Sequence, residues 1–167
     1  RAPGASPCAR VRVRGREFPA TAAALAGGRL TLRFGANGLQ AVLQAEARPD
    51  CIVLRVESVS GGDVDALVFL NVPLTLAGTP AEPFGACAHS LNLFTRVPAL
   101  PVLQSELRAS CEKKFGLVGA RVAIVAAPMA QLLPALQATL AGASELPVCR
   151  TAGPWAREVP FNHGSYL

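Results

Sequence analysis

Short runs of alternating apolar and polar residues, separated by glycine, proline and asparagine, constrain the fold of this chain more than any other feature. In residues 29–34 every second side chain is apolar, and the others include two arginines. A period of two residues is that of a β-strand with one buried face. Residues 39–47 repeat the alternation after a turn with Asn37-Gly38, two residues that tolerate positive φ. The two runs therefore predict a β-hairpin.

Four further strand-like runs follow, each bounded by turn residues. They cover residues 51–58, 64–77, 86–94 and 102–110. Pro73 has no N–H to donate to a sheet ladder, so it indicates an edge strand or a bulge in the second of these runs. Strands spaced about 8–12 residues apart are typical of antiparallel sandwiches or barrels. We therefore predict a mainly β protein, an antiparallel β-sandwich.

The last third of the chain contains one helix signal. After a strand-like run over 116–125, apolar residues recur at helical spacing between Pro128 and Gly142, which typically begin and end a helix. This pattern predicts one amphipathic helix over about 128–141, with its apolar stripe in the core and a bend at Pro134. The stripe consists of Met129, Leu132, Leu133, Leu136 and Leu140. The connection into this helix lacks the glycines of a phosphate-binding loop, so no nucleotide cofactor is predicted.

The excess positive charge lies at the start of the chain. The sequence has 16 Lys and Arg against 11 Asp and Glu, and five arginines precede the first acidic residue, Glu17. We therefore divide the chain into three parts: a basic, Ala/Gly-rich arm (1–28), a β-sandwich domain (29–150) and a linker or docking segment (151–167). Because the excess charge belongs to the arm and not to a face of the folded body, no nucleic-acid partner is predicted.

Part of that arm also has a strand pattern. Arg10, Arg12 and Arg14 alternate with Val11 and Val13, which is typical of an edge strand whose charged side faces water and discourages aggregation.

Composition excludes several classes of protein. With 51% hydrophobic and 16% charged residues, the chain can bury a core and is not intrinsically disordered. No apolar run reaches the ~18–20 residues of a membrane helix, so no membrane partner is predicted. No signal peptide is visible, but the chain begins at Arg1, so the compartment stays open, an extracytoplasmic one included.

The five cysteines lack the spacing of a metal site. They are far apart, and no C-x-x-C pair or Cys–His cluster occurs. Their apolar neighbours favour buried free thiols. One or two disulfides, or a reactive thiol, remain as alternatives. The five are Cys8, Cys51, Cys87, Cys111 and Cys149.

Few residues are available for catalysis, and none is assigned a catalytic or metal-binding role. Glu106 and Glu112 could form a carboxylate pair, but a solvated pair is the stronger interpretation. Two aspartates, Asp63 and Asp65, are too few for a Ca²⁺ site and are interpreted as turn residues. His89 lies in an apolar run, where a core or rim histidine is expected.

The C-terminal segment holds the candidate contact residues. It contains the only Trp and the only Tyr of the chain. Aromatic rings beside polar groups can stack on a sugar or anchor a protein interface. The candidates for carbohydrate or interface contacts are Trp155, Phe161, Asn162, His163 and Tyr166.

Three blocks of the sequence carry a resemblance. They are residues 70–74, residues 114–125 and the closing stretch from Gly153-Pro154-Trp155 to Gly164-Ser165-Tyr166-Leu167. Over about residues 28–167 the chain resembles the amino-terminal β-sandwich domain of bacterial multidomain α-galactosidase-like glycoside-hydrolase proteins. The resemblance implies that the Ser-Tyr-Leu block leads into a (β/α)₈ barrel that carries the catalytic carboxylates. No catalytic residue is thus carried over to this chain.

We expect a non-catalytic accessory domain of a carbohydrate-active multidomain protein, packing against the following barrel of the same parent chain. The alternative is an autonomous carbohydrate-binding module, which needs an exposed aromatic platform. A small thiol-based enzyme is a third hypothesis, and the absence of a nucleophile–base spacing argues against it.

Overall fold

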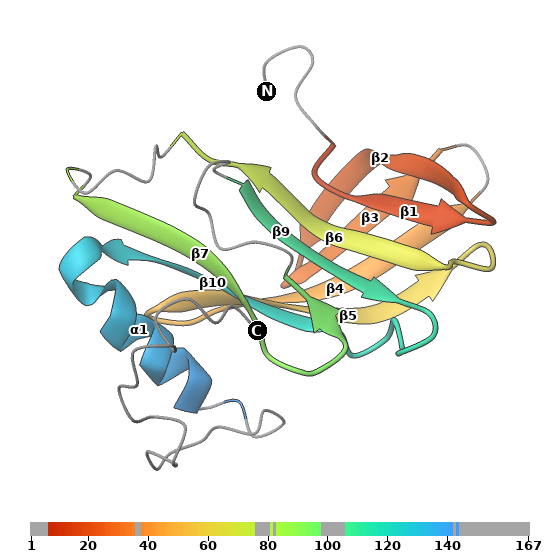
Figure 1. Ribbon diagram of the computed structural model, residues 1–167. Coiled ribbons are helices and arrows are strands. Elements are labelled where there is room, and N and C mark those ends of the chain that lie inside the picture. The colour runs from red at the N-terminus through yellow and green to blue at the C-terminus, as the bar shows by residue number, and fades with distance from the viewer. Residues whose placement is uncertain are drawn as a thin grey trace, which may run out of the picture.

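The computed structural model describes residues 7–35, 38–75, 81, 83–97, 106–141 and 143. Within them, ten antiparallel strands form one continuous sheet, and a single helix follows near the C-terminal end (Figure 1). The predicted mainly β class is confirmed. The strands are β1 (Arg10–Val13), β2 (Arg16–Ala26), β3 (Arg29–Phe34), β4 (Leu39–Ala47), β5 (Cys51–Ser60), β6 (Ala66–Pro73), β7 (Phe84–Ser90), β8 (Thr95–Arg96), β9 (Glu106–Glu112) and β10 (Arg121–Pro128), and the helix is α1 (Met129–Ala141).

The sheet folds over on itself around one core. Its order is β7-β10-β5-β4-β3-β2-β1-β6-β9-β8, and the long strand β2 continues from the part with β3 to the part with β1. A register shift between Ala20 and Ala22 interrupts the pairing of β2 with β3, and such bulges increase local bending and twist. Figure 1 shows β1, β6 and β9 in front of β3 and β4. Apolar side chains from both layers, such as Leu67 and Leu43, meet in one buried cluster.

The N-terminal strands correct two expectations. Residues 10–26, which the sequence analysis placed in an arm, form β1 and β2 and belong to the sheet. β1 is also not an edge strand, because it pairs with β2 on one side and with β6 on the other. Val11 on β1 is buried in the core while the neighbouring arginines point outward. The alternation thus showed which side of β1 is buried, but it could not show which strands lie beside it.

The predicted hairpin is present and consists of β3 and β4. Phe34 pairs with Leu39 and Arg29 pairs with Gln44, so β3 and β4 face each other along their whole overlap. The flanking glycines of the turn, Gly35 and Gly38, both have positive φ. Asn37 lies outside the described residues.

Three other strands differ from their predicted bounds. The run 86–94 is a strand only as far as Ser90, where β7 ends, and the two-residue strand β8 begins after the run, at Thr95. The run 116–125 becomes a strand only from Arg121, because the preceding loop turns at Gly116 and Gly119, both with positive φ. Pro73 ends β6 opposite Glu106, beyond the residues 66–68 that pair with β1, so at this proline β6 pairs with β9 alone. A register shift between Val68 and Leu70 interrupts the same strand.

The helix α1 covers the outer face of β10 and β7. Leu132, Ala135 and Leu136 pack against a second apolar cluster that includes Val53 and Val125. Leu133, which the sequence analysis placed in the core, is 63% exposed instead. The buried side of the helix follows positions 132, 135, 136 and 139, and Leu133 is turned about 100° away from Leu132. No helix among the described residues has the length and apolar character required to cross a membrane.

Candidate functional site

The predicted contact residues of the C-terminal segment lie outside the described residues. This applies to Trp155, Phe161, Asn162, His163 and Tyr166. The candidate site described below is instead formed by arginines from distant parts of the chain that the sheet brings together.

Two arginines on β1 begin this site. Arg10 and Arg12 point outward on β1, while Val11 between them is buried. Arg10 lies opposite Val68 of β6, and Arg12 lies opposite Ala66. The arginines thus line one border of a floor that β6 provides.

Two further arginines come from the other side of β6. Ser110 of β9 pairs with Val68, and Arg96 of β8 pairs with Ser110. Arg108 precedes Ser110 by two residues on β9, so its side chain leaves the same face of the sheet. The order across the sheet is Arg10, Val68, Ser110, Arg96.

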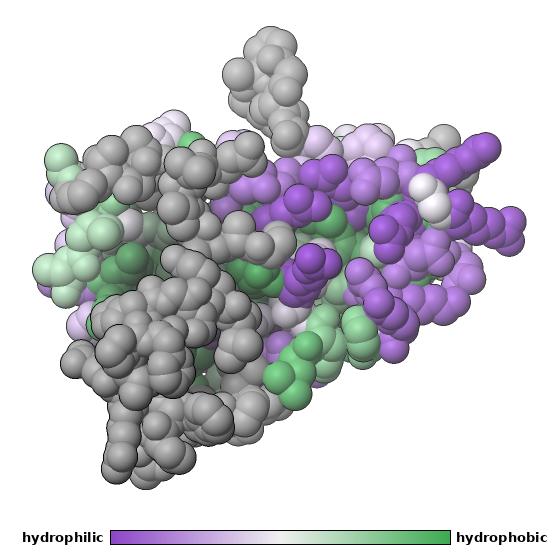
Figure 2. All heavy atoms as spheres, viewed as in Figure 1, coloured by the Kyte–Doolittle hydropathy of each residue, from purple (hydrophilic) through white to green (hydrophobic). Residues whose placement is uncertain are grey.

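These strands enclose a shallow hollow on the outer face of β1, β6, β9 and β8. Its volume is about 150 Å³. Figure 2 shows hydrophilic residues gathered over β1 and the neighbouring β6 on this side of the molecule. We call this surface the arginine face, and its lining residues are Arg10, Arg12, Glu17, Ala66, Val68, Arg96, Arg108, Ser110, Cys111 and Glu112.

The charges on the arginine face are not balanced. Four arginines and two glutamates line the hollow, which leaves an excess of two positive charges. Arg10 Nη1 lies 3.4 Å from Glu17 Oε2, and Arg108 Nη1 lies 3.9 Å from the carboxylate of Glu106. Both separations are longer than the ~2.7–2.9 Å of a strong charge-assisted hydrogen bond. Among the described residues, the Nε atoms of Arg10 and Arg108 are buried and have no hydrogen-bond partner.

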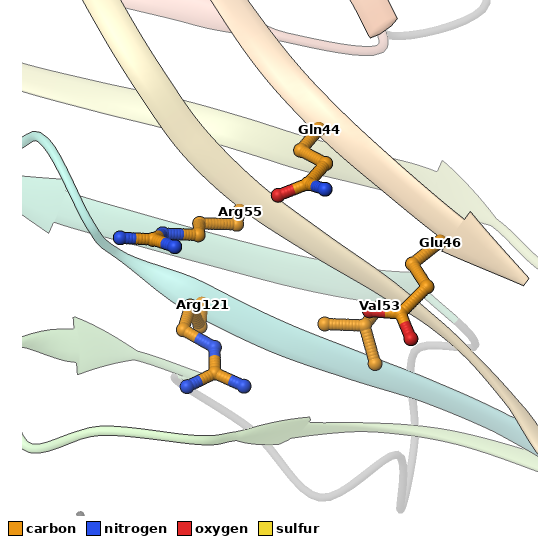
Figure 3. A pocket seen from close by; sticks show the side chains of 5 residues that line it. All are labelled: Gln44, Glu46, Val53, Arg55 and Arg121. Atoms are coloured by element: carbon orange, nitrogen blue, oxygen red, sulfur yellow. The ribbon is translucent and has the colours of Figure 1, made fainter. Parts of the chain in front are cut away.

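A second polar hollow lies on the outer face of β4, β5 and β10. Gln44, Arg55 and Arg121 form one row across the three strands, since Gln44 pairs with Arg55 and Arg55 pairs with Arg121 (Figure 3). Glu46 and Val53 complete the lining, and the volume is about 140 Å³. Two arginines directly opposite each other repel, so the pair destabilises the sheet unless a negative group lies near.

Negative charge is already present beside this second hollow. Arg48 Nε donates to Glu46 Oε1 at 2.9 Å, and Arg48 Nη2 donates to Oε2 at 3.1 Å. The hydrogen bond from Arg48 lowers the pKa of Glu46, and the charge of Arg121 acts in the same direction. Arg121 itself has an interaction within the chain. Two arginines and one glutamate line the second hollow, which leaves one excess positive charge, against two on the arginine face.

The carboxylates considered for catalysis lie at the surface in ion pairs. Glu106 lies beside Arg108, and Glu112 Oε2 is 3.1 Å from Lys114 Nζ. Asp63 pairs with Lys113, whose hydrogen bond lowers the pKa of Asp63. These contacts favour the interpretation of Glu106 and Glu112 as solvated groups and of Asp63 as a turn residue. Among the described residues, no three His, Cys, Asp or Glu side chains are grouped as metal ligands.

The described cysteines are free thiols, and three of them are buried. Cys51, Cys87 and Cys111 are buried, Cys8 is partly exposed, and Cys149 lies outside the described residues. Burial raises the pKa of Cys87 and raises that of Cys111 to about 12. A catalytic thiol needs the opposite shift, because the thiolate is the nucleophile. His89 is half-buried on β7, and burial lowers its pKa.

One flank of α1 leaves large apolar side chains uncovered. Met129 and Leu133 are one helical turn apart and are 49% and 63% exposed. On the other flank, alanines and prolines line a groove of about 470 Å³ between α1 and the turn at Pro49.

Comparisons with protein-family models, with curated proteins and with solved structures gave no match. The function is therefore inferred from the surfaces of the sheet and of α1 and from the resemblance of the three sequence blocks.

Proposed function

We propose that this chain is a non-catalytic accessory domain of a carbohydrate-active, glycoside-hydrolase-like multidomain protein, and that it packs against the domain that follows it. The resemblance of the three sequence blocks supports the class of parent protein. The exposed apolar flank of α1 supports the docking role, and it is the observation on which the proposal mainly rests.

α1 leaves the apolar side chains of Met129 and Leu133 uncovered. Its buried side already packs on the sheet through Leu132 and Leu136. Exposed apolar side chains that adjoin one another commonly mark interaction surfaces in soluble proteins. Met129 and Leu133 adjoin each other because residues four apart share one side of a helix. Met129 and Leu133 lie in the first two turns of α1, at the end where the helix follows β10.

The alanine and proline groove on the other flank of α1 supports the same role. Ala126, Pro134 and Ala138 are among its lining residues, and Asp50 and Gln131 supply its polar groups. Small side chains let a neighbouring domain approach the helix closely, and the two polar residues can fix its orientation. Both flanks of α1 can therefore take part in one interface.

The proposal predicts a further polypeptide of the parent protein beyond Leu167, and that polypeptide is the binding partner in the test. We expect that polypeptide to bind this chain when the two are mixed, as measured by titration calorimetry. Leu133→Asp should weaken the binding by about tenfold or more, because it places a charge in an apolar interface. Leu25→Asp is the matched control, since Leu25 on β2 is 68% exposed and lies away from α1. It should leave the affinity unchanged.

Two outcomes would contradict the accessory role. One is the absence of binding between the two polypeptides, or equal binding by Leu133→Asp and the unmodified chain. The other is hydrolysis of aryl-glycosides by this chain alone that is lost in Glu106→Gln or Glu112→Gln, because those carboxylates would then be catalytic.

A further inference from the structure

We propose that the arginine face binds the anionic groups of an acidic carbohydrate, such as a uronate or a sulfated sugar. The carbohydrate class rests on the proposed function, whereas the anionic character rests on the residues of the face itself.

The guanidinium groups of Arg10 and Arg108 are incompletely hydrogen-bonded within the part of the chain that the structure describes. The buried Nε atoms of Arg10 and Arg108 have no hydrogen-bond partner among the described residues. A buried donor without a partner costs free energy, so such groups are normally satisfied by protein, water or a ligand. Guanidinium groups bind carboxylate, sulfate and phosphate through paired N–H donors. Because the Nε atoms are buried, an oxyanion in the hollow would contact the exposed part of these guanidinium groups, whose side chains are 26% and 36% exposed.

The spacing of the side chains on the arginine face leaves room for a ligand. Arg10 and Arg96 lie at opposite borders of the floor, three strand spacings apart, which is about 14 Å. Between them on the same row are Val68 and Ser110, which have short side chains, and Ala66 lies beside this row. The short side chains on this row leave room for a ligand across the strands, and Arg108 and Glu112 border the row, two residues on either side of Ser110 on β9.

Acidic side chains in the lining of the hollow favour a carbohydrate over a nucleic acid as its ligand. Glu17 and Glu112 lie among the arginines and can accept hydrogen bonds from sugar hydroxyl groups. The same carboxylates would repel a continuous phosphate backbone. Interleaved arginines and glutamates therefore suit a ligand with separated negative charges and many hydroxyls.

The experiment measures binding of polygalacturonate and of chondroitin sulfate to the purified chain, with neutral dextran and a single-stranded oligodeoxynucleotide in parallel. We expect both acidic polysaccharides to bind, dextran not to bind, and added salt to weaken the binding. Arg12→Gln together with Arg96→Gln should raise Kd by about tenfold or more, because contacts to charged groups are lost. Both residues are exposed, so the double variant should stay folded.

The matched control is Arg33→Gln together with Arg55→Gln. It removes the same number of exposed positive charges from other parts of the sheet, and Arg55 belongs to the second hollow. The control should bind both polysaccharides as the unmodified chain does. Circular dichroism and thermal unfolding of each variant establish that the fold is retained.

Four results would overturn the proposal. They are no binding of either acidic polysaccharide, equal binding by the Arg12/Arg96 variant, a comparable loss in the Arg33/Arg55 control, and tighter binding of the oligonucleotide than of both polysaccharides at the same salt concentration. Leu133→Asp should keep full polysaccharide binding. Failure of the docking role and failure of this site are therefore observed separately.

Discussion

Gly61 lies directly against Gly38. A Cβ atom at Gly61 would be 2.1 Å from the carbonyl oxygen of Gly38, a separation that no side chain can adopt. Gly61 also has a φ of +88°, which disfavours any residue with a Cβ. The turn after β5 and the turn before β4 therefore touch through backbone atoms, and this contact holds two neighbouring turns of the sheet together.

We expect Gly61→Ala to destabilise the protein strongly. Gly15→Ala is the control, because Gly15 also has positive φ but has no atom within 4 Å of its missing Cβ. Both variants bear the conformational cost, and only Gly61→Ala adds the clash, which should contribute about 1–3 kcal/mol. Denaturant titration measures the difference. Equal stability of the two variants would contradict the contact between the turns.

The two neighbouring leucines of α1 should respond differently to truncation. Leu136→Ala should cost about 1–3 kcal/mol of unfolding free energy, since Leu136 packs on the second apolar cluster. Leu133→Ala should change stability by less than about 0.5 kcal/mol, because its side chain is mostly exposed. Urea unfolding of the two variants compares them. A large loss in Leu133→Ala would place that leucine in the core.

A small hydrogen-bond network should make Thr95 important for stability. Thr95 Oγ1 donates to Asn92 Oδ1 at 2.6 Å and accepts from the backbone N–H of Arg121 at 2.8 Å. Thr95→Val keeps the shape but leaves both partners without this bond, so we expect a loss of about 2–4 kcal/mol. Thr95→Ser retains the hydroxyl and should lose less. Equal losses in thermal or denaturant unfolding would show that the hydroxyl contributes little.

The buried thiol of Cys111 should make stability fall at alkaline pH. Burial raises the pKa of Cys111 from 9.0 to about 12, so the folded protein retains the thiol proton more strongly than the unfolded chain. The stabilisation is complete below pH 9 and is lost as the pH rises from about 9 toward 12. In that range the slope should approach 1.4 kcal/mol per pH unit.

Cys111→Ala is the control for this pH dependence. It should be less stable at pH 8, because it leaves a cavity, but its stability should fall less steeply above pH 9. Denaturant titrations at several pH values measure both slopes. Parallel curves for the variant and the unmodified chain would assign the alkaline loss to other groups.

Much of the fold could be predicted because strand and helix patterns are local. The period of two in β3 and β4 indicated both strands and the hairpin that joins them. Pro128 and Gly142 bracket a helix that is observed as Met129–Ala141. Strand bounds were less accurate where turns were formed by glycines within apolar runs, as at Gly116 and Gly119.

The candidate site could not be predicted in the same way. Arg10 and Arg12 were visible in the sequence but were assigned to an arm, because the alanine-rich β2 gives only a weak period of two. No local pattern links them to Arg96 and Arg108, which are more than eighty residues further along the chain. The only signal available was the outward alternation of arginine on β1.

The sequence by itself determined which side of β1, β3 and β4 is buried, since that follows from alternation along a few residues. It also determined that a single helix follows the last strand. Only the tertiary structure decided that β1 lies between β2 and β6, which brings four arginines onto one face. It likewise decided that Leu133 of α1 stays outside the core. The physical reason is that strand neighbours and helix orientation depend on contacts between distant residues, and these are selected by the hydrogen bonding and burial of the whole sheet.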